Sequence, residues 1–553
     1  MKTSLLLSLP LLAAPALAQD AGPVTGLPLN DSVCEAILAE AAAGNQVMAH
    51  LDELVNGIGP RLTSSTACTE ACEWAVQRFR DFGVPEVRME AWGEWPVGFD
   101  RHGMRGRVVE PKKVPLVMTT RSWTPGTDGM TRGRVVAAPS DQAELDAARG
   151  SLAGTWVLLG GTRPRFGEGD SFGHALGAFL LEEGVHGTLT ASRGELVTTG
   201  GNHRIEWDAL PELTQVTLRR DQAKDLGAWL EEGQEVVVEL DLDQEFVQGP
   251  IPLYNVIAEI PGSEKPEELV IFGGHIDSWD GATGTNDNGT GCATTMEAAR
   301  LLMAALEKTG TRPKRTIRFM LWSGEEQGLW GSREYIAQHP EENDRISGVL
   351  VHDGGTNYLS GIVATPAMLP MFEEVFAPVE AMVAGLEDPE FDFEIRTVDR
   401  LPQGIGSDHD SYVRVDVPGF FWSQAGESNY NYVHHTQHDT YDSAIARYEE
   451  HSAKIIAMTA WRLGAAEQMI PRGEAPRRLL GVRLADEALR VTGLTDGGQA
   501  AELGLLEGDL IVRVGDLIVV DRRDLSRAIR SGEPRKTITV ERGGELLSFE
   551  FSW

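Results

Sequence analysis

The chain has 553 residues, 42% of them hydrophobic, which is enough for several domains with sizeable buried cores. Its 83 acidic and 49 basic residues leave a formal net charge of −34. So acidic a chain argues against nucleic acid and against anionic membrane surfaces as partners, and the excess charge is typical of a soluble protein.

The first eighteen residues have the features of an export signal. Lys2 precedes an apolar run from Leu5 to Leu12, and Ala16-Leu17-Ala18 is a small-residue pattern that signal peptidases cleave. The run is too short to span a bilayer, and no other segment reaches about 18 uninterrupted apolar residues. We therefore expect a signal peptide at residues 1–18 and an exported protein, periplasmic or secreted, without stable membrane insertion.

The four cysteines are too few for a disulfide-scaffolded protein. An oxidising compartment would permit one bridge, between Cys34 and either Cys68 or Cys72. The spacing of Cys68 and Cys72 would also suit a metal, but no second Cys or His pair accompanies them. Cys292 lies in an apolar helical run and is expected in the core.

The first part of the chain changes from helical to β-rich character. Residues 32–82 have apolar residues at three- and four-residue intervals, which predicts helices interrupted by a turn at Asn56–Pro60. From about residue 91 to residue 248, short β-rich runs accompany a helical segment at Ser171–Glu183. This mixture indicates a compact inserted domain.

After Pro250 the chain alternates between apolar strands and helices, as in an α/β fold with a mostly buried sheet. The longest predicted helix here runs from Asn288 to Leu306. The predicted strands are Leu269–Phe272, Thr316–Trp322, Gly348–Val351 and Gly419–Trp422. A helix ending near Gln468 leads into a linker rich in proline, glycine and charge, and a small β-rich unit follows.

Polar side chains follow the ends of these apolar strands. His275, Glu326 and Asp353 come at or just after a strand, and Asp287 lies in the loop after the first strand. Ligand sites of open α/β sheets form at this carboxyl edge. A fifth candidate, His435, lies in a polar and aromatic loop after the last strand. We expect these five side chains to be metal ligands.

Their charges indicate two divalent ions. Several carboxylates in one cleft repel each other unless cations compensate them. Two divalent cations would balance three ligating carboxylates and one bridging hydroxide, with both imidazoles neutral. A mixed set of imidazole and carboxylate ligands suits zinc and also admits Mn²⁺ or Co²⁺. The sequence therefore predicts two Zn²⁺ ions.

The spacing of these residues also indicates their roles. Asp287, in a loop before a helix, is expected to bridge the ions, with His275 and Asp353 completing one site and Glu326 and His435 the other.

Two further acids are expected around the ligands. Asp277 could accept the second N–H of the His275 imidazole and set its tautomer. Neighbouring residues of an extended chain point opposite ways, so Glu325 can face substrate while Glu326 holds metal. We expect Glu325 to be the general base. Taken singly, such residues are usually solvated or satisfied polar groups, and it is their joint placement that favours a site.

Five ordered motifs resemble the M28 family of co-catalytic zinc exopeptidases, and within it the carboxypeptidase Q group. These motifs are Gly274–Trp279, Asn286–Gly289, Trp322–Gly328, Asp353–Gly355 and His434–Thr436. The resemblance covers roughly residues 30 to 470. It implies a phosphorylase/hydrolase-like α/β fold, two zinc ions and a catalytic base at Glu325.

The resemblance also bears on residues around the metals. Some relatives have a tyrosine directly before the last histidine ligand, where this chain has His434, which is a candidate substrate contact or a packing residue. Asp408, in Gly406–Asp410, resembles a residue of the substrate side of the cleft.

Two further units resemble known domains. The region 100–248 is similar to a protease-associated insert, and residues 477–553 are similar to a bacterial PDZ domain, whose groove could bind a peptide C-terminus. A purely structural appendage is the alternative. The expected domains are a signal peptide (1–18), the N-terminal part of the peptidase domain (19–95), a protease-associated insert (96–248), the main peptidase domain (249–470), a linker (471–476) and a PDZ-like domain (477–553).

The expected function is hydrolysis of terminal peptide bonds of small peptides, as an aminopeptidase or dipeptidase. A carboxypeptidase is the alternative, because the sequence does not determine which end is cleaved. Surplus carboxylates near the site could pair with a free ammonium, which favours the amino end. A glutaminyl cyclase with a single zinc and a non-catalytic binding protein are weaker alternatives, because all five ligands are present. The oligomeric state is left open.

Overall fold

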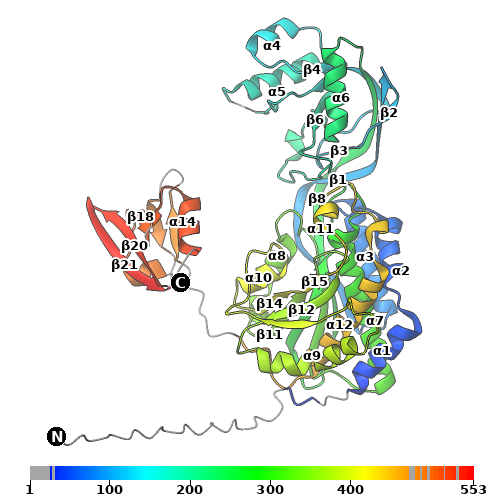
Figure 1. The fold of residues 1–553 in the computed structure, drawn as a ribbon, viewed down its shortest axis with the longest axis vertical. Helices are drawn as coiled ribbons and strands as arrows, with labels where there is room; N and C mark the ends of the chain where they lie inside the picture. Colours follow the sequence, from blue (N-terminus) through cyan, green and yellow to red (C-terminus); the bar gives the residue numbers. More distant parts are fainter. Residues whose placement is uncertain are drawn as a thin grey trace, which may run out of the picture. The chain divides into compact units, whose positions relative to one another are not determined.

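The computed structural model describes residues 25–27, 31–167, 169–472, 480–485, 489–494, 499–515, 517–530 and 535–552. The chain forms two compact units, Met1–Arg472 and Gly473–Trp553 (Figure 1). The predicted signal peptide and most of the predicted linker lie outside the described residues. Within those residues, no helix is both long and apolar enough to cross a membrane.

The first unit is built on one twelve-stranded mixed sheet. At one end of it, β9 runs parallel to β10 and β11, and β11 runs parallel to β14, so their carboxyl ends share one edge. The antiparallel pair β10–β8 joins this parallel part to the rest. These strands are β8 (Val237–Ile260), β9 (Lys265–His275), β10 (Arg315–Trp322), β11 (Ile346–Val351) and β14 (Gly419–Phe421).

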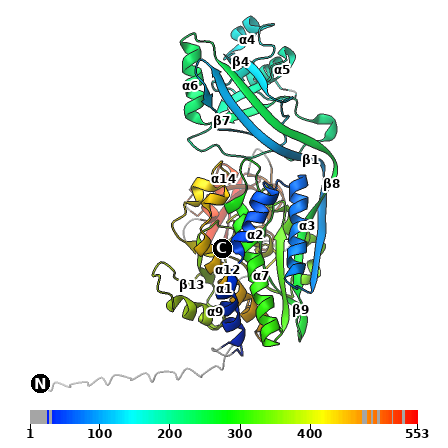
Figure 2. The same ribbon diagram turned by 90° about the vertical axis from the view of Figure 1, so that its right-hand side faces the viewer.

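Helices cover both faces of the parallel strands. Along β10, Ile317 and Phe319 pack into one core cluster while Met320 and Trp322 pack into another, because alternate side chains of a strand point to opposite faces. The helices on the first face include α3 and α7, seen in Figure 2. The helices of this face are α1 (Ser32–Gly44), α2 (Val47–Asp52), α3 (Thr66–Asp81), α7 (Thr290–Thr309), α9 (Leu369–Ala384) and α12 (Ala446–Ala465). Those of the second face are α8 (Trp330–Gln338) and α10 (His409–Val413).

The structure confirms the strands and helices expected after Pro250 to within a few residues. It also confirms helices over residues 32–82, with a π-helical turn, η1 (Glu53–Ile58), at the predicted interruption. A smaller sheet of three strands lies beyond β11 along the chain. Its strands are β12 (Tyr358–Ala364), β13 (Glu394–Thr397) and β15 (Ser423–Ala425).

A long two-stranded ribbon carries the inserted region. β1 (Glu86–Glu110) pairs antiparallel with β8 from Glu86↔Glu259 to Glu110↔Val237, and it rises from the peptidase part to the insert in Figure 1. We call residues 111–236, between these strands, the insert. The predicted limits at residues 96 and 248 fall inside the ribbon, because both strands run through the two parts without a break.

The insert contributes one part of the twelve-stranded sheet, joined to β8 through β4, and has its own cores. β4, β5, β6 and β7 are mutually parallel neighbours, and β3 is antiparallel to β7. The buried Trp156 lies in one core, beneath α6. The elements are β2 (Val114–Pro115), β3 (Met118–Thr120), β4 (Thr131–Ala137), α4 (Gln142–Ala148), β5 (Trp156–Leu158), α5 (Phe172–Glu183), β6 (Gly187–Ala191), β7 (Gln215–Leu218) and α6 (Arg220–Glu231). Whether this is a protease-associated domain stays a prediction.

The second unit is small and β-rich, with a core that includes Ile511, Ile538 and Val540. It has a two-stranded sheet, β16–β17, and a four-stranded sheet in the order β19-β18-β20-β21. Its elements are β16 (Val482–Leu484), β17 (Val491–Leu494), α13 (Gln499–Leu503), β18 (Leu510–Val514), β19 (Leu517–Ile518), α14 (Arg522–Arg530), β20 (Arg535–Arg542) and β21 (Glu545–Ser552). The PDZ-like assignment stays a prediction.

All four cysteines are buried free thiols. The bridge from Cys34 to Cys68 or Cys72 that an oxidising compartment would permit is therefore not formed. Cys292 lies in the core of α7, as predicted, and its Sγ donates to the carbonyl oxygen of His275 at 3.0 Å.

A buried acid in α12 makes the stability of the fold depend on pH. Oε2 of Glu449 accepts a 2.7 Å hydrogen bond from Thr294, and burial raises the pKa of Glu449 from 4.5 to about 8. Because the folded state holds this proton more tightly than the unfolded state, stability falls as the pH rises through this interval. We expect Glu449→Gln, which mimics the protonated acid, to gain stability over the wild type by roughly 1–3 kcal/mol between about pH 5 and about pH 8.

Denaturant unfolding at several pH values would measure this gain, with the exposed Glu450→Gln as the matched control. A gain that stays constant or shrinks as the pH rises would contradict the prediction.

Candidate active site

The predicted ligands gather at the carboxyl edge of the parallel strands. His275 is the last residue of β9, Glu325 and Glu326 follow the end of β10, and Asp353 follows β11. Asp287 lies in the turn η3 (Thr285–Gly289) that leads into α7. Because carboxyl ends of parallel neighbours meet at one edge, residues distant in sequence are brought into contact here.

Two carboxylates contact the outer nitrogen of His275. Its Nε2 lies 3.1 Å from Oδ1 of Asp353 and 3.2 Å from Oδ1 of Asp287. Its Nδ1 lies 3.0 Å from the carbonyl oxygen of Asp277, which can only accept a hydrogen bond. The proton therefore belongs on Nδ1, and the Nε2 lone pair faces the two carboxylates.

The other oxygen of Asp287 faces two further histidines. Oδ2 of Asp287 lies 3.0 Å from Nε2 of His435 and 3.6 Å from Nε2 of His434. The Nε2 atom of His435 is also 2.9 Å from Oε2 of Glu326. Two sets of three side chains each place their ligand atoms within 4.8 Å of one another. The first set is His275, Asp287 and Asp353, and the second is Asp287, His434 and His435. Asp287 is common to both sets.

These residues fit divalent metal. The Oδ2 atom of Asp287 is buried without a hydrogen bond of good geometry, although Nε2 of His435 lies only 3.0 Å away. Two donors on one tetrahedral zinc ion, each at about 2.0–2.1 Å, are separated by roughly 3.3 Å. The observed separations and the mixture of imidazole and carboxylate donors match that arrangement.

Asp277 holds the segment that carries Glu325 and Glu326. Its carboxylate accepts hydrogen bonds from the backbone N–H groups of both glutamates, each at 3.3 Å, and from the hydroxyl of Thr63 at 2.8 Å. Its nearer oxygen is 3.5 Å from Nδ1 of His275, farther than its own carbonyl oxygen. The tautomer of His275 is therefore set mainly by the backbone of Asp277, whereas the sequence suggested its carboxylate.

Glu325 faces the same cluster without belonging to either ligand set. Its Oε2 lies 3.9 Å from Nε2 of His275. Burial, reinforced by the charges of Asp353 and Glu326, raises the pKa of Glu325 well above its usual value. Burial and the charge of Asp287 likewise raise the pKa of Glu326 to about 7. Such mutual repulsion is what bound cations would relieve.

The two predicted substrate contacts lie in different surroundings. His434 is half-exposed, and its ring stacks on that of His435 with centroids 3.8 Å apart. Asp408 is completely buried, and burial raises its pKa to about 7.

Sequence reasoning missed Asp439. This buried carboxylate accepts hydrogen bonds from the backbone N–H of Asn286 at 2.5 Å and from that of Asp287 at 3.3 Å. It therefore ties the loop of His435 to the loop of Asp287. The sequence shows that Asp439 lies four residues after His435, but it does not show that Asp439 contacts the loop of Asp287.

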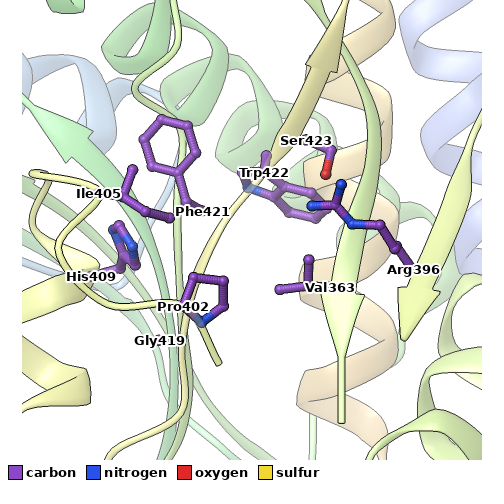
Figure 3. A pocket seen from close by; sticks show the side chains of 9 residues that line it. All are labelled: Val363, Arg396, Pro402, Ile405, His409, Gly419, Phe421, Trp422 and Ser423. Atoms are coloured by element: carbon purple, nitrogen blue, oxygen red, sulfur yellow. The ribbon is translucent and has the colours of Figure 1, made fainter. Parts of the chain in front are cut away.

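A cavity of about 190 Å³ lies beside the edge strand β14 (Figure 3). Phe421 of β14 is paired with Val351 of β11, two residues before Asp353, which places the cavity next to the ligand edge. Arg396 and the buried His409 lie on its wall, and both ring nitrogens of His409 lack a hydrogen-bond partner. Arg396 forms no ion pair with another described residue. The remaining lining residues are Val363, Pro402, Ile405, Gly419, Phe421, Trp422 and Ser423.

Comparisons with known proteins relate the part of the chain that contains these residues to a peptidase family. The profile of peptidase family M28 matches residues 255–460, which contain all five predicted ligands. Residues 255–460 are therefore a peptidase family M28 domain. The chain is 25% identical to carboxypeptidase Q of Homo sapiens over 80% of this chain and 90% of that protein. It is 27% identical to leupeptin-inactivating enzyme 1 of Streptomyces exfoliatus over 55% of this chain and 73% of that protein.

A solved structure shares the fold of this M28 peptidase. The peptidase M28 precursor from Shewanella amazonensis SB2B superimposes with a TM-score of 0.57 at 25% identity, over 80% of this chain and 98% of that one. The protein is therefore a hydrolase, a metallo-exopeptidase, on a mixed α/β fold.

Proposed function

We propose that this M28 peptidase is an exported dizinc exopeptidase that removes terminal residues from small peptides, as an aminopeptidase or dipeptidase. The observation that carries the proposal is the sharing of Asp287 between two sets of potential ligands, with Glu325 beside them. His275 and Asp353 would hold one ion, and Glu326 and His435 the other. His434, in the second set, is a further donor on that side.

The proposed chemistry uses the two glutamates differently. When bound, the ions polarise the scissile carbonyl and make the attacking water more acidic. Glu325 takes a proton from that water and passes it to the leaving amine, so that water and peptide become a free acid and a free amine. The carboxylate of Asp277 keeps Glu325 in place, because it accepts a hydrogen bond from the backbone N–H of Glu325.

The raised pKa of Glu325 suits this role. A general base works best when its pKa lies near the working pH, and burial raises the pKa of Glu325 well above its usual value. Because the base acts only in its ionised form, activity should fall as the pH drops through this pKa.

The cavity in Figure 3 is proposed as a recess for a substrate side chain or end group. Asp408 directly precedes His409 of its wall. Arg396 is exposed at the cavity and has no acidic partner among the described residues, so its guanidinium suits a carboxylate better than an ammonium. Arg396 thus favours substrates with a free carboxyl end, which fits a dipeptidase and keeps a carboxypeptidase as the second candidate.

An assay against matched peptides tests these alternatives. Zinc-reconstituted protein would be given the same dipeptide with both ends free, with an acetylated amine, and with an amidated carboxyl group. A dipeptidase should accept only the first, an aminopeptidase the first and third, and a carboxypeptidase the first and second. Hydrolysis of none of them would contradict the proposal.

The variant Arg396→Ala tests whether Arg396 recognises the free carboxyl end of the substrate. We expect it to lower kcat/KM for the free-carboxylate peptide by about 10- to 100-fold, the effect of losing one charge-assisted hydrogen bond. The amidated peptide should be unaffected. Arg400→Ala, a nearby exposed arginine outside the cavity, is the matched control. An equal loss of kcat/KM on both peptides would show that Arg396 does not recognise the substrate carboxylate.

The terminal segments complete the proposal. Residues 1–18 would direct the chain out of the cytoplasm, and the second unit would act as a PDZ-like domain that binds a peptide C-terminus or serves as a structural appendage.

A further inference from the structure

The insert reaches the metal-ligand loop through a short segment, Val197–Gly201, which we call the insert loop. The backbone N–H of Thr199 donates to the carbonyl oxygen of His435 at 2.8 Å. Thr198 forms an antiparallel bridge with Thr436, and the N–H of Val197 donates to Oε1 of Gln437 at 2.8 Å. Three consecutive residues of the insert loop thus hold three consecutive residues that begin at a candidate ligand.

His435 needs such support. Its φ of +57° lies in the left-handed region, which residues with a β-carbon rarely adopt. A strained conformation persists only where the surrounding structure determines it. Here the chain on the amino side is the short helix α11 (Tyr430–Val433), and the carbonyl of His435 is held by Thr199.

The insert loop also contacts the other side of the centre. A Cβ placed on Gly281 would lie 1.6 Å from Cγ2 of Thr199, so the threonine is seated directly against this glycine. Gly281 follows Asp280. The carboxylate of Asp280 forms a buried ion pair with Arg101 at 2.9 Å and accepts a hydrogen bond from the hydroxyl of Ser122 at 2.6 Å.

A further hydrogen bond connects Ser122 to the insert loop. The backbone N–H of Ser122 donates to the carbonyl oxygen of Gly200 at 3.0 Å, within the insert loop. The loop is therefore fixed between the segment after His275 and the segment that bears His435. Trp279 continues the same contact zone, because its ring meets those of His435 and Trp123 edge to face at 6.2 and 6.4 Å.

We infer that the insert loop is a positioning element of the catalytic centre, which holds His435 in the backbone conformation that directs its imidazole toward Asp287 and Glu326. The inference rests on the proposed function, because it takes His435 to be a metal ligand. It gives the insert a role in metal binding.

Gly281→Ala tests the inference, because the added methyl group must displace Thr199. We expect the affinity for Zn²⁺, measured by competition with a chelator, to fall about 10- to 100-fold for one of the two ions, the usual effect of losing support around a ligand. We expect kcat to fall with it while KM changes little. Gly160→Ala, an insert glycine with no atom within 4 Å of the new methyl group, is the control.

A second substitution distinguishes displacement of the loop from general damage. Thr199→Ser removes Cγ2 and keeps both the backbone N–H and the hydroxyl. In the double variant Gly281→Ala/Thr199→Ser, zinc affinity should return to that of Thr199→Ser alone. Unchanged zinc affinity in Gly281→Ala, or no recovery in the double variant, would overturn the inference. Peptide hydrolysis by the wild type that is about 10²–10⁴-fold slower in Glu325→Gln would uphold the proposed function in either case.

Discussion

Glu325→Gln is expected to lower kcat by about 10²–10⁴-fold while both metal ions stay bound. Glutamine has the size of glutamate but cannot take a proton from water. Oε2 of Glu325 lies 3.9 Å from Nε2 of His275, near the ligands but outside both ligand sets, so its loss should spare metal affinity. Initial rates on a free dipeptide and metal content of the purified variant are the two measurements.

The pH profile adds a second readout. In the wild type, the acid limb of kcat/KM should lie above the pH expected for an ordinary glutamate, because burial raises the pKa of Glu325. The residual activity of the variant should lack that limb. Glu341→Gln, at an exposed glutamate in the turn after α8, controls for the loss of one charge. Full activity in Glu325→Gln would exclude it as the base.

Asp287→Asn should have the larger effect on metal binding, because Asp287 belongs to both ligand sets. An amide oxygen is neutral and a poorer bridging ligand than a carboxylate, so we expect both ions to bind weakly. Loss of several kcal/mol of transition-state stabilisation corresponds to a fall in kcat of about 10³-fold or more. Zinc stoichiometry and affinity, with the activity at saturating zinc, would measure this.

Asp353→Asn is the matched comparison, because Asp353 belongs to one set only. It should weaken the binding of one ion and leave the binding of the other unchanged. The zinc-dependent rise in the unfolding temperature should therefore be partly kept. In Asp287→Asn that rise should vanish. Equal zinc affinities in the two variants would show that Asp287 is not shared between two ions.

Much of the centre could be predicted because it follows from local pattern and general topology. Apolar runs of strand length predict buried parallel strands, and polar residues directly after them must lie at one sheet edge. His275, Glu326 and Asp353 are such residues. The structure places His275 in contact with Asp287 and Asp353, and Glu326 in contact with His435. The crowding of carboxylates could likewise be expected from their number alone.

Other contacts could not be predicted, because they join segments that no local pattern relates. Asp439 contacts the loop of Asp287 across more than 150 residues, and Thr199 contacts His435 from within the insert. In the turn after β9, side chains no longer alternate as they do in a strand, so the carbonyl of Asp277, and not its carboxylate, makes the closest contact with His275.

By itself, then, the sequence determined the order of strands and helices, the sheet edge at which the candidate ligands gather and the set of those candidates. These depend on hydrophobic period and on residue type. Only the tertiary structure decided which oxygen faces which nitrogen, that the cysteines remain free thiols, and that the insert supports His435. The physical reason is that hydrogen bonds and metal ligation depend on atomic positions to within a few tenths of an ångström, and loops acquire those positions only when distant segments pack against them.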